Sequence, residues 1–180
     1  MKLYDHITKR IEKFIAAQKI FFVATAADHG RINLSPKGMD SFRVIDKNKV
    51  LWLNLTGSGN ETAAHLLKND RMTIMFCSFE GKPLILRLYG NARIFHEKDQ
   101  VYQTHIDMFP RMAGSRQIIE MDVDLAQTSC GFAVPLMDFR EERTHLNAWA
   151  EKQGEERLEE YRKKKNARSI DGFDTGTIGH

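Results

Sequence analysis

The sequence contains few cysteines and no long apolar run, and each shortage excludes a class of protein. Its two cysteines, Cys77 and Cys130, lie far apart and form no C-x-x-C or zinc-site spacing, so we expect buried thiols in a reducing compartment. The longest apolar run, residues 20–27, is far shorter than the roughly 20 residues that cross a bilayer. No apolar segment follows the first lysine, and these features together predict a cytoplasmic protein that does not enter a membrane.

An excess of one charge is missing as well. The 27 Lys and Arg residues nearly balance the 24 Asp and Glu residues, and a net charge of +3 gives no reason to expect nucleic acid as a partner. The basic run at residues 162–165 shares its segment with glutamates at positions 155, 156, 159 and 160, which is typical of a solvated helix face. The histidines are scattered without a ligand spacing, so we expect no metal site.

What remains is the composition of one globular domain, 42% hydrophobic and 28% charged. Strand patterns recur at residues 20–26, 31–35, 41–45, 50–56, 71–79, 83–95, 117–128 and 129–134. In residues 50–56, alternation predicts that Leu51, Leu53 and Leu55 share one face. Helical patterns cover residues 5–18, with Asp5 placed as the cap, the stretch after Glu97 and the segment from about Arg140. This order predicts a mainly β protein with helices (α+β), an antiparallel barrel over residues 1–139. Residues 140–180 form a helix packed on the same domain and a tail that is either docked or disordered.

Two stretches carry polar side chains in a pattern that suggests a binding site. In the strand from Arg31, the residues Arg31, Asn33 and Ser35 share one parity, and Lys37 projects to the same side after Pro36 has ended the strand. The second stretch, residues 57–62, is a glycine loop that leads into a helix, whose first amides and dipole suit a phosphate. The loop alone is better interpreted as a turn capped by Asn60 or Ser58, and only the strand beside it favours an anion site.

The stretch 51–66 with residues 69–72, set beside residues 31–38 and Gly90, resembles the pyridoxamine 5'-phosphate oxidase-like flavoproteins, the FMN-binding split-barrel group. The resemblance covers residues 10–135 as an order of elements. It implies a split β-barrel, a homodimer and FMN in a cleft at the subunit interface.

In this family, a strand like residues 31–37 supplies phosphate and ribityl contacts, and a loop like residues 58–62 completes the phosphate site. The resemblance therefore implies these cofactor-binding residues: Arg31, Asn33, Ser35, Lys37, Asn54, Thr56, Ser58, Gly59, Asn60 and Thr62. Lys37 is the first choice for the phosphate cation, because a charged donor makes strong hydrogen bonds to a phosphate. The sequence identifies no catalytic acid or base.

The sequence also departs from the family pattern. Glu61 and Thr62 stand where oxidases of the group often carry an Arg-Lys pair, Ile85 replaces a glutamine, and residues 136–143 do not supply the motif that grips pyridoxal phosphate. The implied function is an FMN-dependent oxidoreductase with hydride transfer at flavin N5, acting on an unidentified small-molecule substrate or electron donor. The alternatives are a non-catalytic flavin- or haem-binding module, and a partner protein with an empty cleft.

Overall fold

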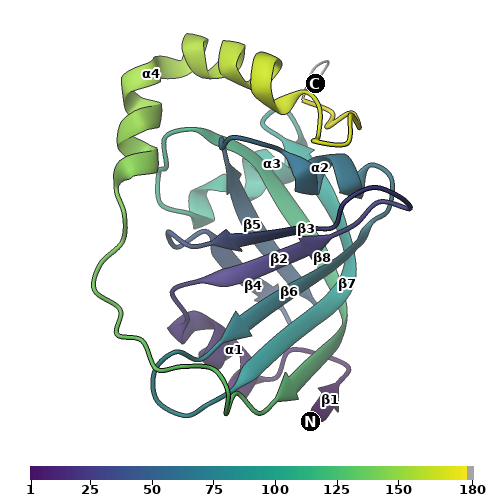
Figure 1. The fold of residues 1–180 in the computed structure, drawn as a ribbon, viewed down its shortest axis with the longest axis vertical. Helices are drawn as coiled ribbons and strands as arrows, with labels where there is room; N and C mark the ends of the chain where they lie inside the picture. The colour runs from purple at the N-terminus through teal and green to yellow at the C-terminus, as the bar shows by residue number, and fades with distance from the viewer. Residues whose placement is uncertain (178–180) are drawn as a thin grey trace.

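One antiparallel sheet of eight strands dominates the fold that the computed structural model describes for residues 1–177 (Figure 1). Its strands are β1 (Lys2–Tyr4), β2 (Phe21–Thr25), β3 (Asn33–Lys37), β4 (Phe42–Asp46), β5 (Lys49–Leu55), β6 (Arg71–Cys77), β7 (Ile85–His96) and β8 (Ser115–Ser129). They follow the order β3-β2-β6-β7-β8-β5-β4, and β1 pairs with β8. Across the described residues β3 and β4 do not pair, so the barrel stays split. The predicted antiparallel split barrel is confirmed.

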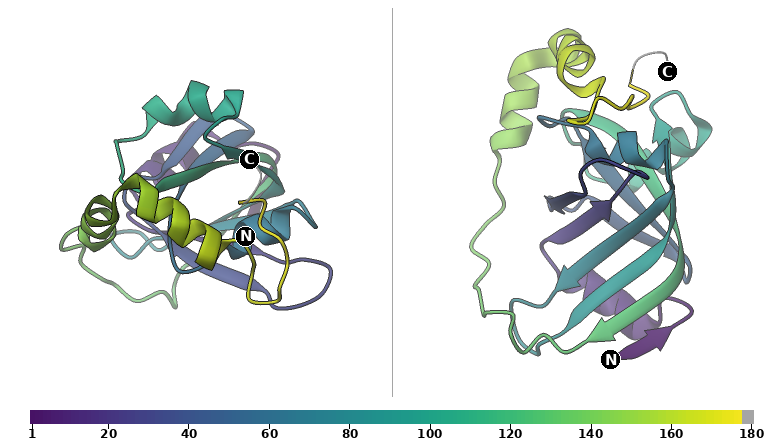
Figure 2. Two further views of the ribbon diagram at one scale, coloured as in Figure 1. Left: turned by 90° about the horizontal axis from the view of Figure 1, so that it is seen from above. Right: turned by 45° about the vertical axis from the view of Figure 1, so that its right-hand side comes forward.

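The helices are α1 (Lys9–Ala17), α2 (Glu61–Leu66), α3 (Gln100–His105) with a 3-10 turn η1 (Ile106–Met108), and α4 (His145–Tyr161) with a π-helical turn η2 (Arg162–Asn166). Figure 1 shows α1 at the end of the barrel near the N-terminus and α4 across the opposite end, above α2 and α3. The view from above in Figure 2 shows α4 and the tail lying over the barrel mouth. None of the helices described up to residue 177 is long and apolar enough to span a membrane.

Two predicted boundaries at the start of the chain are wrong. The first helix begins at Lys9 rather than near Asp5, because Thr8 is the N-cap and its side-chain oxygen accepts the Ile11 N–H at 3.3 Å. Pro36 does not end the next strand but lies inside β3, opposite Phe22. A proline is tolerated there because β3 is the edge of the sheet and its outer side needs no hydrogen-bond donor.

The second half of the chain differs from the prediction in two further places, the last strand and one cysteine. Strand β8 is continuous through Ser115–Ser129, and residues 130–134 form no strand. Helix α4 is broken at Gly154, whose φ of 72° is non-helical. Cys77 is buried as predicted, but Cys130 is exposed, which corrects the prediction of two buried thiols.

The core lies on both faces of β5 because every residue from Val50 to Asn54 is buried. Val50 and Trp52 face the barrel interior, where Trp52 packs edge-on against Phe21 in the larger hydrophobic cluster. Leu51 and Leu53 face the opposite way, into a second cluster formed with the α3 segment. The predicted leucine face is thus the outer one, while the Trp52 and Asn54 face leads from the core toward the polar end of the barrel.

Gly90 lies opposite a β-bulge in β8, where Asp124 is the extra residue. The β7–β8 register shifts between Tyr89 and Gly90, and a Cβ atom on Gly90 would lie 1.9 Å from the backbone oxygen of Asp122. Only glycine allows this close approach of two strands, as the sequence pattern suggested.

Candidate functional site

A polar cavity of about 320 Å³ opens where β3 and β5 meet the loop before α2. Eight of the ten site residues predicted from the sequence line it: Asn33, Ser35, Lys37, Asn54, Ser58, Gly59, Asn60 and Thr62. Arg116 lines it too and was not predicted. A larger hollow of about 510 Å³ lies at the other end of the barrel, beside α1 and β1, and contains none of the predicted residues. The smaller cavity is the candidate site because the predicted site residues gather there.

The β3 wall is held in place by a chain of side-chain hydrogen bonds. Ser35 donates to Asn33 Oδ1 at 2.8 Å, and Asn33 Nδ2 donates to Thr62 on α2 at 3.1 Å and to Thr25 on β2 at 3.2 Å. The Thr25 hydroxyl also pairs with Nδ1 of the buried His65 at 3.1 Å. This network fixes the strand against the helix, so the cavity wall is rigid without a ligand.

The loop before α2 leads into a helix as the sequence predicts. The dipole of this short helix does not by itself make the loop a phosphate site. Asn60 occupies the N-cap position without making a side-chain cap hydrogen bond, and α2 itself has only six residues. Asn60 is 2% exposed, and its Oδ1 atom has no hydrogen-bond partner within residues 1–177. A buried acceptor with no donor is costly, so Asn60 is suited to accept a hydrogen bond from a ligand. Glu61 turns its carboxylate to the Ile170 N–H at 3.1 Å.

Lys37 supplies a positive charge at the C-terminal end of β3. Its ammonium nitrogen lies 4.9 Å from the centre of the Trp52 ring, a cation–π contact rather than an ion pair. Burial, with a smaller contribution from Arg116, lowers the pKa of Lys37 from 10.5 to about 8. No ion pair with a carboxylate compensates Lys37 in the described part of the chain.

Arg116 supplies the second positive charge, and it enters the site through a bulge. The β5–β8 register shifts between Asn54, opposite Gln117, and Leu55, opposite Ser115, which leaves Arg116 as the extra residue. Arg116 is only 6% exposed, and its Nη1 atom donates to Asn166 Oδ1 at 2.8 Å and to Gly59 O at 3.2 Å. Its Nε atom has no partner among the described residues. Burial, and then Arg162, lower the pKa of Arg116 to about 9.

Two predicted residues lie outside the cavity lining. Arg31 is exposed and forms an ion pair with Asp171 in the C-terminal tail. Thr56 is buried, where its hydroxyl donates to Gly114 O at 2.9 Å and accepts from Arg162 Nε at 2.9 Å. The structure therefore gives both side chains partners within the protein.

The electrostatics of the cavity favour an anion. Lys37 and Arg116 place two positive charges beside the polar hollow. Glu61 also lines it, but neither cation forms an ion pair with a carboxylate within residues 1–177. Burial lowers the pKa of both groups, and a neighbouring cation lowers each further, Arg116 for Lys37 and Arg162 for Arg116. Repulsion of this kind is relieved by a bound anion, and a phosphate fits the donors best. In residues 1–177, no three His, Cys, Asp or Glu side chains come together as a metal site.

Comparison with known sequences places this chain in a family. The sequence model described as pyridoxamine 5'-phosphate oxidase matches residues 7–130. A relative from Aspergillus flavus, described as pyridoxamine 5'-phosphate oxidase family protein ustO, is 36% identical over 94% of this chain and 76% of its own length. The chain belongs to the pyridoxamine 5'-phosphate oxidase family.

Solved structures share the fold of this family member at low sequence identity. HupZ of Group A Streptococcus has a TM-score of 0.56 and 22% identity, covering 73% of this chain and 99% of its own. A Lactobacillus delbrueckii protein described as a candidate pyridoxamine 5'-phosphate oxidase has a TM-score of 0.56 and 14% identity, covering 71% of this chain and 99% of its own. Both alignments leave more than a quarter of this chain unmatched, and they support the split-barrel fold alone.

Proposed function

We propose that this member of the pyridoxamine 5'-phosphate oxidase family binds FMN in the polar cavity and acts as an oxidoreductase. The observation that supports the proposal most is the pair of positive charges on Lys37 and Arg116, neither of which forms an ion pair with a carboxylate in the described part of the chain. The phosphate group of FMN carries close to two negative charges, so it matches this pair. We exclude Arg31 from the proposed site because its charge is neutralised by an ion pair with Asp171.

The remaining residues fit the polar part of the cofactor. Ser35, Ser58 and Thr62 offer hydroxyl groups, and the unpartnered Oδ1 of Asn60 would accept from a ribityl hydroxyl. Asn54, which donates to Gln117 at 3.0 Å, lies on the strand face that continues toward the ring. Glu61 also lines the cavity, but its carboxylate accepts the Ile170 N–H of the tail, and we assign it no contact with the cofactor.

The bound flavin would supply hydride transfer at its N5 atom. The residues of this chain would bind the phosphate, orient the ring and hold positive charge near it. We assign no side chain as acid or base. The substrate is a small molecule or an electron donor, and the missing pyridoxal phosphate motif argues against pyridoxamine phosphate itself.

We also propose that the functional unit is a homodimer. The cavity of about 320 Å³ is near the lower limit of drug-sized pockets, and its lining is mostly polar, whereas a tricyclic ring needs apolar walls. On the outer face of β3, beside the cavity, Ile32 is 78% and Leu34 is 65% exposed. A second copy packed on this edge would cover both side chains and supply the missing wall.

The exposed and unpaired Cys130 fits a reducing cytoplasm.

The purified protein tests the cofactor directly. We expect a yellow protein that releases fluorescent FMN on denaturation and oxidises a nicotinamide or consumes oxygen when screened with electron donors. A yellow protein without turnover would support a flavin carrier, and a red one would indicate haem. A colourless protein that does not bind added FMN would overturn the proposal.

A further inference from the structure

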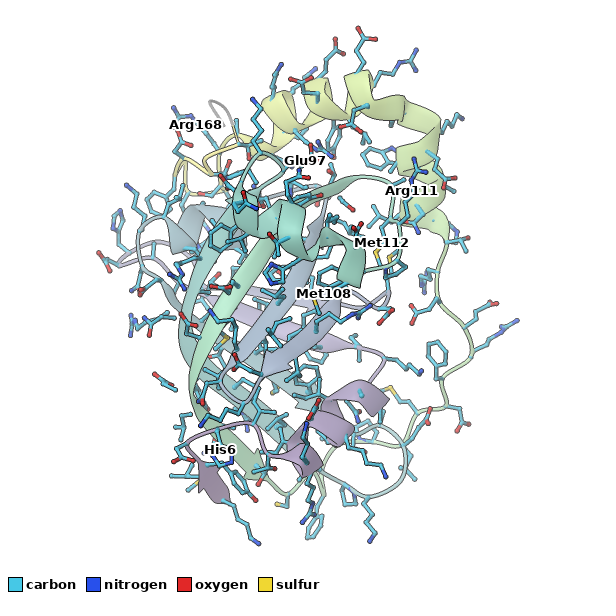
Figure 3. The ribbon with its side chains drawn as sticks, turned by 180° about the vertical axis from the view of Figure 1, so that it is seen from behind. His6, Glu97, Met108, Arg111, Met112 and Arg168 are labelled. Carbon is cyan, nitrogen blue, oxygen red and sulfur yellow. The ribbon has the colours of Figure 1, made fainter. Side chains whose placement is uncertain are left out.

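The C-terminal segment, residues 162–177, packs behind the loop that lines the polar cavity. It follows α4 across the barrel mouth and descends beside α2 (Figures 1 and 2). Arg162 anchors its start, because Nε donates to Thr56 Oγ1 at 2.9 Å and Nη2 donates to Ser115 O at 2.8 Å. From behind, Figure 3 shows Glu97 beneath α4 and Arg168 on the tail. These hydrogen bonds dock the start of the described tail on the barrel, and residues 178–180 of the predicted tail lie outside the described residues.

Asn166 is the centre of this contact. Its side chain is fully buried, and its Nδ2 atom donates to Gly57 O at 3.0 Å while its Oδ1 atom accepts from Arg116 Nη1 at 2.8 Å. One amide thus joins the loop before α2 to the buried cation. Asn166 O in turn accepts the hydroxyl of the buried Thr175 at 2.5 Å, which folds the tail back on itself.

The far end of the tail contacts the loop before α2 and the residues just before β3. Asn60 Nδ2 donates to Thr177 Oγ1 at 3.1 Å on the loop side. On the β3 side, Asp171 accepts the backbone N–H of Arg31 at 2.7 Å and also pairs with its guanidinium group. Gly30 makes room for this contact, because a Cβ atom there would lie 2.6 Å from Asp171 Oδ2.

We propose that residues 162–177 support the phosphate site of FMN from behind its lining, with Asn166 as the central positioning residue. The inference rests on the proposed function, since it assigns the cavity to FMN. Asn166 does not line the cavity itself. It orients Arg116, which does, and fixes the loop at Gly57, so its influence on the cofactor passes through these two groups.

This arrangement makes a distinctive prediction, because Arg116 faces the phosphate end of the site. Loss of Asn166 would free Arg116 and the loop, and would weaken FMN, which carries the phosphate. Riboflavin lacks the phosphate but shares the ring and the ribityl chain. A general loss of structure would weaken both ligands, whereas a positioning role weakens FMN alone.

The experiment compares FMN and riboflavin titrations of the full chain with Asn166→Ala and Asn166→Asp. For Asn166→Ala we expect FMN affinity to fall about tenfold and riboflavin affinity to change less than about twofold. Asn166→Asp would pair with Arg116 and neutralise it, so FMN affinity would fall at least as far. Its thermal midpoint should not fall below that of Asn166→Ala, because the buried charge gains a partner.

Ile170→Ala is the matched control, since this side chain lies on the same tail but is 70% exposed. We expect it to bind both ligands as the unchanged chain does. The positioning role would be overturned if both Asn166 variants weakened FMN and riboflavin binding equally, or if either variant kept the FMN affinity of the parent chain. Neither result would affect the proposal that the parent chain binds FMN. A parent chain that bound neither ligand would overturn the proposed function as well.

Discussion

Lys37 illustrates how a single side chain is committed to a ligand. A partly buried ammonium group normally has a carboxylate partner, because burial without one disfavours the charged form. Lys37 has the Trp52 ring and a second cation instead, and its pKa falls to about 8. The folded protein without ligand therefore carries an electrostatic cost that an anion would remove.

Replacing Lys37 should separate stability from binding. For Lys37→Met we expect FMN affinity to fall about 10- to 150-fold, corresponding to the loss of a charged hydrogen bond of about 1.5–3 kcal/mol. The urea midpoint of the ligand-free protein should not fall, because the uncompensated charge is removed. Fluorescence titration and urea unfolding measure the two effects. Lys68→Met, at an exposed position, serves as the control, and unchanged FMN affinity in Lys37→Met would remove Lys37 from the site.

The lowered pKa also predicts how pH acts on the site. Since Lys37 loses its proton near pH 8 when folded and near 10.5 when unfolded, the unfolded chain binds more protons in between, and ligand-free stability should rise with pH across that window. FMN affinity should move the other way. It should fall as pH rises through about 8 and also below about 6, where the phosphate gains a proton.

Lys37→Arg tests the origin of this profile. An arginine keeps its charge at higher pH, so the alkaline fall in FMN affinity should begin later in this variant than in the parent chain. Identical profiles for Lys37→Arg and the parent chain would show that another group controls the pH dependence.

At the level of elements, two bulges shape the site and the sheet. The bulge between β5 and β8 turns Arg116 into the cavity, and the bulge at Gly90 allows β7 and β8 to approach closely. Both interrupt the alternation of side chains, so each moves a residue away from the face that simple parity would give it.

Gly90→Ala tests the second bulge. Its Cβ would lie 1.9 Å from Asp122 O, a contact that only a backbone shift relieves. We expect a loss of about 1–3 kcal/mol in the free energy of unfolding, or more, read from the urea midpoint. Gly57→Ala is a matched stability control, because no atom lies within 4 Å of its added Cβ. A Gly90→Ala midpoint as high as that of the parent chain would contradict the close approach.

At the scale of the whole molecule, the open edge of the barrel is the surface on which we expect a second copy of the chain to pack. Strand β3 presents its polar face to the cavity and its apolar face, with Ile32 and Leu34, to the outside. An edge strand with exposed apolar side chains favours association.

Leu34→Glu should disrupt that association. We expect sedimentation of the parent chain to give twice its mass of 20.8 kDa, and Leu34→Glu to give a single-chain species with weaker FMN binding. Leu3→Glu, also exposed but on β1 at the other end of the barrel, should remain dimeric. A single-chain mass for the parent at all concentrations would refute the dimer.

Much of the site follows from short-range patterns. Alternation along β3 places Asn33, Ser35 and Lys37 on one face because successive side chains of a strand point to opposite sides, and the structure keeps that face on the cavity. The leucines of β5 were assigned to one face for the same reason. Pro36 misled the prediction because its effect depends on whether a strand lies at an edge or inside a sheet.

Other parts of the site depend on contacts that no local pattern contains. Arg116 shares its parity with Ile118, which is in the outer core, and only the pairing of β8 with β5 creates the bulge that redirects it. The only local signal was an arginine next to the start of a predicted strand, and it gave no direction for the side chain. Arg31 follows the polar pattern of β3, yet Asp171, far along the chain, captures it.

The sequence by itself determined the split barrel, its family and the polar strand and loop, because residue alternation and turn chemistry act between near neighbours. The tertiary structure alone decided that Arg116 joins Lys37 in one cavity and that Asn166 holds it there. The physical reason is distance along the chain: strand pairing and tail docking are set by the balance of burial and hydrogen bonding over the whole fold.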